Sequence, residues 1–281
     1  MSFRLAIWLF INPQKGAAMD IIDLTEKHHP QYFCCLEDWS DEIKEAGNQK
    51  ELWFNKMKDK GLRVKLAVDN DTVCGMIQYA PAGHSFIDGK DVYFINCIWV
   101  HGHKKGIGNY QKKGIGKSLL AAAEDDVKKM NQKGIAAWGL SLPFWMKASW
   151  FKKQGYKKAD KDGMAVLMWK PFENDAIPPR WIKQKKKPQK IKGKVTVTSF
   201  INGWCQAQNM VHERAKRAAQ EFGDAVQFQG INTSDRDVLC EWGMCDALFI
   251  DDKQVRIGPP PSFESIHKKI GKRVKKLARK V

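Results

Sequence analysis

The feature that most constrains this chain is a glycine-rich turn that runs directly into a helix-forming stretch. The pentapeptide Lys-Lys-Gly-Ile-Gly occurs twice, at 104–108 and 112–116, and only the second copy continues into the leucine- and alanine-rich residues 117–123. Such a turn points several backbone N–H groups and the positive end of the helix dipole at one small volume. We therefore expect an anion site at residues 111–118, which we call the cradle, with phosphate as its ligand.

Three phosphate-binding motifs compete for these residues, and spacing separates them. A P-loop ends in Gly-Lys-Ser, as residues 116–118 do, but Gln111 stands where its first glycine belongs. The dinucleotide motif G-x-G-x-x-G fails because Leu119 takes the place of its third glycine. The pattern Q/R-x-x-G-x-G/A fits completely from Gln111 to Gly116, after the strand-like run 92–100.

At these residues the chain resembles the GNAT superfamily of acyl-CoA N-acyltransferases, whose pyrophosphate-binding motif has this form. The order of elements supports the resemblance, because an apolar strand at 135–140, a helical stretch at 143–153 and a strand at 164–169 follow the expected helix. The resemblance covers roughly residues 19–172 and implies an α/β fold with a mixed sheet. An ordinary glycine-rich surface loop before an amphipathic helix is the competing interpretation.

The resemblance implies a reaction in which an acyl group, usually acetyl, passes from acetyl-CoA, the co-substrate, to an amine by direct attack in a ternary complex. It places the pyrophosphate in the cradle and the pantetheine arm along the backbone of the preceding strand, whose groups could also polarise the thioester carbonyl. The implied cofactor-binding residues are Ile98, Trp99, Val100, Gln111, Lys112, Lys113, Gly114, Ile115, Gly116, Lys117 and Ser118.

The reaction also needs a base for the ammonium proton and an acid for the leaving thiolate. The family often has a tyrosine where this chain has Phe151, so the usual acid is missing, and Ser149, Ser141, a water or the substrate are the alternatives. Candidate bases by neighbourhood are Tyr93, His101 and His103. A solvated loop is the competing interpretation of the two histidines.

The second half of the chain has a different character. Residues 173–193 are rich in proline and lysine and predict a basic linker. The predicted elements that follow are strand 195–200, helix 206–222, strand 225–230, helix 235–242, strands 247–250 and 255–257, and helix 262–280. This order resembles the thioredoxin fold. The whole chain resembles GNAT proteins with a YoaP-like, thioredoxin-related C-terminal domain.

These patterns predict four parts of the chain. They are an N-terminal extension at 1–18, a GNAT acyl-CoA N-acyltransferase domain at 19–172, the basic linker at 173–193, and a thioredoxin-like domain with a basic terminal helix at 194–281.

One cysteine stands out in the predicted thioredoxin-like domain. Cys205 lies at a strand-to-helix turn, where such a domain has its nucleophile and where a helix N-terminus is expected to lower the pKa of the thiol. The second cysteine of C-x-x-C is absent, which excludes a dithiol oxidoreductase on that motif. Three interpretations stay open: a reversible pair with Cys245, a catalytic monothiol, and an inert packing residue.

The net charge of +17 is unevenly distributed. Residues 183–194 carry seven basic residues, residues 268–281 carry eight, and neither segment has an acidic one. A connector and the solvent-facing side of an amphipathic terminal helix account for this surplus. Contact with nucleic acid or another anionic surface is the alternative, without being favoured.

Composition limits the remaining classes. No apolar run approaches the ~20 residues of a membrane span. Residues 1–18 loosely imitate a signal peptide, but Met19 is the favoured start of the folded part, and a cytoplasmic enzyme is expected because acyl-CoA is cytosolic. The seven cysteines are odd in number and lack paired zinc spacings, so no metal is expected.

The sequence therefore predicts an acetyl-CoA-dependent N-acetyltransferase that acts on a small-molecule or peptide amine. The alternative function is a nucleic-acid-associated or monothiol redox protein with a non-catalytic GNAT fold.

Overall fold

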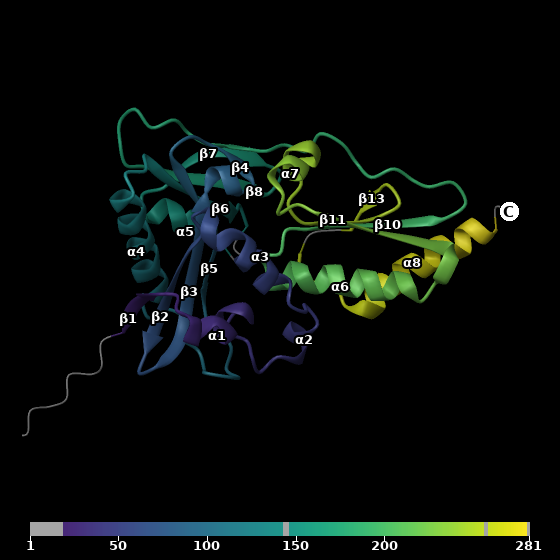
Figure 1. Ribbon diagram of the computed structural model, residues 1–281, viewed down its shortest axis with the longest axis horizontal. Coiled ribbons are helices and arrows are strands. Elements are labelled where there is room, and N and C mark those ends of the chain that lie inside the picture. The colour runs from purple at the N-terminus through teal and green to yellow at the C-terminus, as the bar shows by residue number, and fades with distance from the viewer. Residues whose placement is uncertain (1–18, 143–145, 256–257, 280–281) are drawn as a thin grey trace, which may run out of the picture.

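A computed structural model describes residues 19–142, 146–255 and 258–279 of the chain. The predicted N-terminal extension, with its signal-like pattern, lies outside these ranges. Figure 1 shows two bodies side by side, each built around its own sheet. We call them the N-terminal unit, residues 19–172, and the C-terminal unit, from residue 194 onward.

A seven-stranded mixed sheet forms the centre of the N-terminal unit. Every neighbouring pair of its strands is antiparallel except β5 and β6, which are parallel. This arrangement confirms the predicted α/β fold with a mixed sheet. In spatial order the strands are β1 (Asp20–Asp23), β2 (Arg63–Asp69), β3 (Thr72–Pro81), β5 (Val92–Val100), β6 (Gly134–Leu140), β8 (Ala165–Pro171) and β7 (Lys157–Asp162).

Helices cover both faces of this sheet. One face carries α4 (Ile115–Lys129) and α5 (Ala148–Lys153). Leu119, Ala123 and Val127 of α4 recur at helical spacing and are fully buried against the strands. The other face carries η1 (Glu26–His28), α1 (His29–Phe33) and α3 (Gln49–Met57), which continues into η2 (Lys58–Lys60), whereas α2 (Asp41–Lys44) packs against the C-terminal unit.

Helix α5 is shorter than the sequence predicts. The pattern at 143–153 favours one continuous helix, but Lys147 has an extended backbone and the helix begins at Ala148. Met146 has a positive φ of 53°, which is incompatible with a right-handed helix. Residues 143–145 lie outside the described part of the chain.

The C-terminal unit is a four-stranded sheet in the order β11-β10-β12-β13. Strands β10 and β11 are parallel, and the other pairs are antiparallel. Its elements are β10 (Val195–Ile201), α6 (Gln206–Gln220), η4 (Gly223–Ala225), β11 (Val226–Asn232), α7 (Arg236–Trp242), β12 (Ala247–Ile250), β13 (Lys253–Gln254) and α8 (Phe263–Ala278). The return strand expected at 255–257 begins earlier, with Lys253 and Gln254 paired to β12, and the Val255 N–H donates to the Leu248 carbonyl at 2.8 Å. Residues 256–257 lie outside the described part of the chain.

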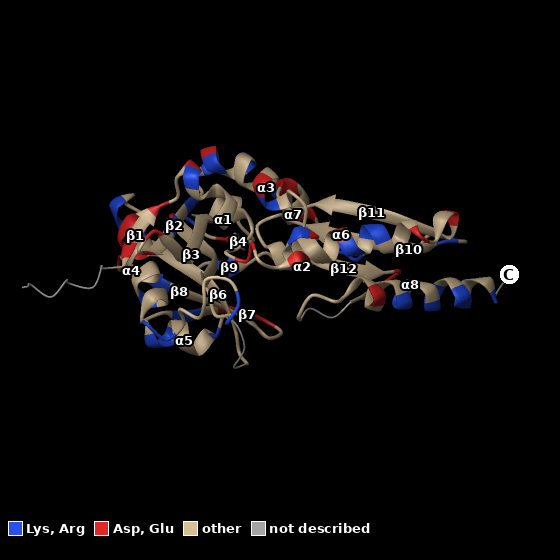
Figure 2. Ribbon diagram, turned by 90° about the horizontal axis from the view of Figure 1, so that it is seen from below, with Lys and Arg blue, Asp and Glu red and all other residues tan. Residues whose placement is uncertain are grey.

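Helices α6 and α8 pack together on one face of this sheet. Ile266 and Ile270 of α8 are fully buried, while the lysines of the helix are exposed to solvent, as expected for an amphipathic helix. Figure 2 shows these basic residues at intervals along α8.

The linker and several side chains join the two units. Strand β9 (Arg180–Trp181) of the linker pairs with β4 (Ile87–Asp88), and Trp181 stacks on Phe86 at 6.3 Å between ring centroids. Arg236 of α7 donates to the carbonyl oxygens of Ala82 and Ile87, at 3.2 and 3.1 Å. The linker is therefore packed against both units. Among the described residues, no helix is long and apolar enough to cross a membrane.

Candidate active site

The cradle opens helix α4 as the sequence predicts. Gly114 precedes the helix with a φ of 85°, a left-handed conformation that glycine adopts without strain. The N–H groups of Lys117 and Ser118 donate back to the Gly114 carbonyl, at 2.9 and 3.2 Å. Within the described residues, the N–H groups of Ile115 and Gly116 donate to no backbone carbonyl. These two donors point out of the first turn and are free for an anion.

His101 anchors the loop between strand β5 and the cradle. Its side chain is fully buried, with Nδ1 at 2.6 Å from the Gly108 carbonyl oxygen and Nε2 accepting a hydrogen bond from Trp39 Nε1 at 3.1 Å. Both ring nitrogens are therefore engaged. In this arrangement His101 has no free nitrogen for a substrate proton.

The first copy of Lys-Lys-Gly-Ile-Gly belongs to the same anchor. A Cβ on Gly106 would lie only 2.2 Å from Trp39 Cδ1, so only glycine lets the indole pack there. This copy shapes the loop, and only the second copy begins a helix.

A cavity of about 540 Å³ lies beside the cradle. Most of the predicted cofactor-binding residues line this cavity. They are Ile98, Trp99, Val100, Gln111, Lys112, Gly114, Ile115, Gly116 and Lys117. Lys113 and Ser118 do not line it, and the ammonium of Lys113 lies over the Tyr110 ring at 4.5 Å. Charged lysines, free N–H groups and a backbone strand thus meet at one cavity.

The lining also includes residues that sequence reasoning missed. Tyr110, Met146, Lys147 and Trp150 belong to the wall, together with Phe151, which the sequence singles out for another reason. Tyr110 directly precedes the cradle in the sequence, and this adjacency could have identified it as a lining residue. Met146, Lys147 and Trp150 lie just before or within α5, and the sequence pattern did not show that this helix begins only at Ala148.

The part of β5 that lines the cavity lies beyond the point where β5 and β6 separate. These strands pair only from Val92 to Ile95 on β5, opposite Gly134 to Ala137 on β6. Asn96 follows at a β-bulge, its carbonyl accepts a hydrogen bond from Trp138 Nε1 at 2.8 Å, and its buried Oδ1 has no partner among the described residues. Backbone groups next to this gap are therefore available to a ligand that enters between the strands.

The other predicted catalytic residues lie outside the cavity. Tyr93 is at the start of β5, the end away from the cradle, and is buried against Tyr79 at 6.0 Å between ring centroids. Burial raises the pKa of Tyr93, which does not suit a base. Ser149 is exposed on α5 and does not line the cavity. His103 Nε2 lies 3.4 Å from Glu37 Oε1 in the loop.

Cys205 differs from its expectation in one respect. It precedes helix α6 as predicted, but burial raises the pKa of its thiol to about 12. The effect of burial on this pKa is therefore larger than the opposite effect of the helix N-terminus. It packs with Cys35, Cys97 and Cys245 at the boundary between the units. The seven cysteines are all free thiols, so the structure contains no Cys205–Cys245 disulfide.

The C-terminal unit reaches into the N-terminal unit next to Cys205. Gln78 Nε2 on β3 donates to the Trp204 carbonyl at 3.2 Å, and the Trp204 ring lies 6.4 Å from that of Trp138. Trp204 Nε1 in turn donates to Asp246 Oδ2 at 3.1 Å. One face of the central sheet, close to the gap between β5 and β6, is thus covered by the C-terminal unit.

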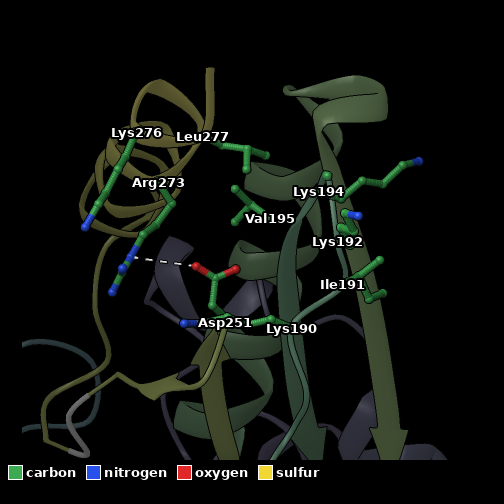
Figure 3. Close-up of a pocket in the computed structure, with 10 residues that line it drawn as sticks. Lys190, Ile191, Lys192, Lys194, Val195, Asp251, Arg273, Lys276 and Leu277 are labelled. Carbon is green, nitrogen blue, oxygen red and sulfur yellow. Dashed lines mark ion pairs between the residues drawn. The ribbon is translucent and has the colours of Figure 1, made fainter. Parts of the chain in front are cut away.

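A second cavity, of about 440 Å³, lies between the linker and α8. Its lining is strongly basic, but Figure 3 shows Lys194 and Lys276 pointing away from each other. Arg273 instead lies 4.0 Å from Asp251, and Lys190 lies 3.0 Å from Asp252. The cations of this cavity do not converge on one ligand position. In the described ranges, no group of His, Cys, Asp and Glu is arranged to hold a metal ion.

Comparison with known proteins identifies the first half of the chain. Residues 21–142 match the profile of the Acetyltransferase (GNAT) family. The chain is 24% identical over 228 residues to the uncharacterized N-acetyltransferase YoaP of Bacillus subtilis (strain 168), covering 78% of this chain and 84% of that protein.

Solved structures of GNAT proteins overlap the same half. An acetyltransferase from Staphylococcus aureus Mu50 is 18% identical, covers 56% of this chain and 100% of its own, and has a TM-score of 0.41. The PaiA N-acetyltransferase of Thermoplasma acidophilum, solved in complex with coenzyme A, is 18% identical, covers 55% of this chain and 99% of its own, and has a TM-score of 0.39.

Residues 21–142 are therefore a GNAT acetyltransferase domain, and the chain is an acyltransferase enzyme. The predicted GNAT domain and the predicted enzyme class are confirmed.

Proposed function

We propose that this protein transfers an acetyl group from acetyl-CoA to an amine by direct attack. The observation that carries the proposal is the cradle, whose free N–H groups and lysines open onto a cavity of about 540 Å³ between a helix N-terminus and the end of β5. A pyrophosphate needs this combination of donors and positive charge. Lys112 and Lys117 add charge at the cradle, and Lys147 adds it on the opposite wall.

The exposed end of β5 is suited to the pantetheine arm. Ile98, Trp99 and Val100 line the cavity on the side where β5 has lost β6 as its neighbour. Unpaired strand groups bind an extended amide chain as an additional strand would be bound. With the pyrophosphate in the cradle, the arm would run along β5 toward Asn96, and the thioester carbonyl would face backbone N–H groups at the bulge.

The amine must lose a proton before it attacks, and the C–S bond breaks as the new N–C bond forms. That first proton passes to solvent, and the nitrogen then loses a second proton, which reaches the leaving thiolate. Phe151 is buried in the cavity wall where the family often has a tyrosine, so this chain supplies no phenol at that position. We propose that water or the substrate carries this second proton. Among the described residues, the buried Asn96 Oδ1 near the gap has no hydrogen-bond partner and can accept a hydrogen bond from the amine or from that water.

We infer that the C-terminal unit is a thioredoxin-like domain without dithiol chemistry. Support comes from its parallel β10-α6-β11 start, its α7-β12-β13-α8 continuation and its sheet order β11-β10-β12-β13. The raised pKa of Cys205 and its burial at the boundary favour a packing role over a nucleophilic one. In this proposal the C-terminal unit covers one face of the acyltransferase sheet, and Trp204 makes the contact with that face.

A thiol-release assay with acetyl-CoA tests the enzymatic proposal. The assay covers polyamines, aminoglycosides, amino acids, thiol-bearing amines and peptide N-termini, and mass spectrometry identifies an acetylated product. We expect amine-dependent CoA release with at least one of these classes. Absence of release throughout, combined with no CoA binding by calorimetry, would refute the proposal.

A further inference from the structure

The boundary between the two units contains a third cavity, of about 150 Å³, which is separate from the cofactor cavity. The N-terminal unit contributes Trp53, Lys56, Lys60 and His84 to its wall, and the C-terminal unit contributes Asn202, Thr233, Ser234, Asp235, Arg236 and Leu239. Its volume exceeds the ~30 Å³ of one water molecule in the liquid. The space is large enough for one small polar group that touches both units.

Positive charge converges on this boundary cavity. Lys56, Lys60 and Arg236 line it, and Asp235 is the only acidic residue of the lining. The Asp235 carboxylate already accepts the Asp237 N–H at 3.0 Å. In the part of the chain that the structure describes, the three cations form no ion pair with a carboxylate.

Two of these cations are held in place by neutral groups. Lys56 Nζ donates to Ser234 Oγ at 3.0 Å, and Arg236 donates to backbone carbonyls of the N-terminal unit. Their charges are therefore fixed in position without being neutralised. Each of them makes its hydrogen bonds across the boundary, so the arrangement exists only when the two units are docked.

The state of His84 reflects this excess of positive charge. Burial lowers the pKa of the imidazole, and the nearby charges of Lys60 and Arg236 lower it further. A site that disfavours one more positive charge favours a negative one. The hydroxyl of Ser234 already donates to Asn232 Oδ1 at 2.7 Å, so the amino groups of the two lysines are the donors available to an oxyanion.

We propose that the boundary cavity binds one oxyanion group, a phosphate or a carboxylate, of a small molecule, and that this ligand fastens the two units together. An anion there neutralises like charges from both units at once, so it binds the docked chain better than the separated units. The proposal does not depend on the acyltransferase activity, because none of these residues lines the cofactor cavity.

Thermal unfolding of the full chain with inorganic phosphate as the probe tests this proposal. All proteins carry Gly116→Glu, which is designed to place a carboxylate in the cradle so that phosphate does not bind there. Sodium chloride at matched ionic strength controls for screening, and acetate distinguishes a carboxylate ligand from a phosphate. At a tenfold excess over Kd we expect phosphate to raise the melting temperature by roughly 2–5 °C.

Two neighbouring lysines provide matched variants. Lys60 lines the cavity, whereas Lys58 in the same turn does not, and both side chains are exposed. Lys60→Gln should weaken the phosphate effect about tenfold in apparent Kd, which is the loss of one charged contact, and Lys58→Gln should leave it unchanged. Proton NMR adds a second readout, because phosphate should raise the pKa of His84. The proposal would be overturned if phosphate raised the melting temperatures of Lys60→Gln and Lys58→Gln equally. It would also be overturned if chloride raised the melting temperature as much as phosphate does.

Discussion

Arg214 of helix α6 donates to both carboxylate oxygens of Glu45, at 2.7 and 3.2 Å, across the boundary between the two units. The Arg214 side chain is only 5% exposed, and that of Glu45 is 29% exposed. Replacing Glu45 by Gln removes the charged partner to which the buried guanidinium donates two hydrogen bonds and leaves only the more distant, exposed Glu42. We expect Glu45→Gln to lower the free energy of unfolding in urea by about 1–2 kcal/mol at neutral pH.

This ion pair also predicts a pH dependence. The hydrogen bond from Arg214 holds the pKa of Glu45 below its usual value. The folded pKa is depressed, so the stabilisation is fully present above about pH 4.5 and is lost as the pH falls through the folded pKa. The difference between wild type and Glu45→Gln should therefore shrink in acid. Glu42→Gln is the control, because Glu42 is 74% exposed at 3.6 Å from Arg214; an equal loss of stability in that variant would contradict the account.

The loop anchor gives a prediction that separates two nearby histidines. His101 is buried between Trp39 and Gly108, whereas His103 is 45% exposed. His101→Ala removes the partners of the Trp39 N–H and the Gly108 carbonyl, which should loosen the loop before the cradle. We expect a roughly tenfold higher Kd for CoA by calorimetry, about 1.4 kcal/mol. His103→Ala should change Kd little, and the reverse order of effects would argue against an anchoring role.

A buried hydrogen-bond chain connects the two units through the central sheet. Tyr32 donates to Gln78 Oε1 at 2.8 Å, and Gln78 donates onward to the Trp204 carbonyl at 3.2 Å. Gln78→Leu leaves the Tyr32 hydroxyl and that carbonyl unpaired, so it should cost about 1–3 kcal/mol of unfolding free energy. The double variant Gln78→Leu/Tyr32→Phe should be about 1 kcal/mol more stable than the sum of the two single-variant losses predicts. Strictly additive losses of unfolding free energy would mean that the two hydrogen bonds are not coupled.

The thiol of Cys205 should react slowly while the protein is folded. Because burial raises its pKa to about 12, the thiolate fraction at neutral pH is roughly a thousandfold below that of a free cysteine. Iodoacetamide labelling, followed by peptide mass spectrometry, should be slower by that factor than in urea-unfolded protein. Fast labelling of the folded protein would instead support the monothiol interpretation.

Local features of the sequence predicted the site better than long-range ones. The cradle could be predicted because a left-handed Gly114 and the apolar spacing of α4 are properties of neighbouring residues. The packing of Trp39 on Gly106 could not, because it joins residues from distant elements and explains the duplicated pentapeptide only after folding. The pKa of Cys205 was predicted in the wrong direction, because the thiol is buried where the C-terminal unit meets the N-terminal unit.

The cradle as a pyrophosphate site is the central claim, and calorimetric titration of CoA tests it most directly. A Cβ at Gly116 would meet Trp150 at 3.6 Å and Val100 at 4.0 Å, so Gly116→Glu fits the fold while its carboxylate enters the cavity. Ala121→Glu, at an exposed position of the same helix, is the matched control. We predict CoA binding to wild type and Ala121→Glu and its loss in Gly116→Glu; equal binding to all three proteins would contradict the claim.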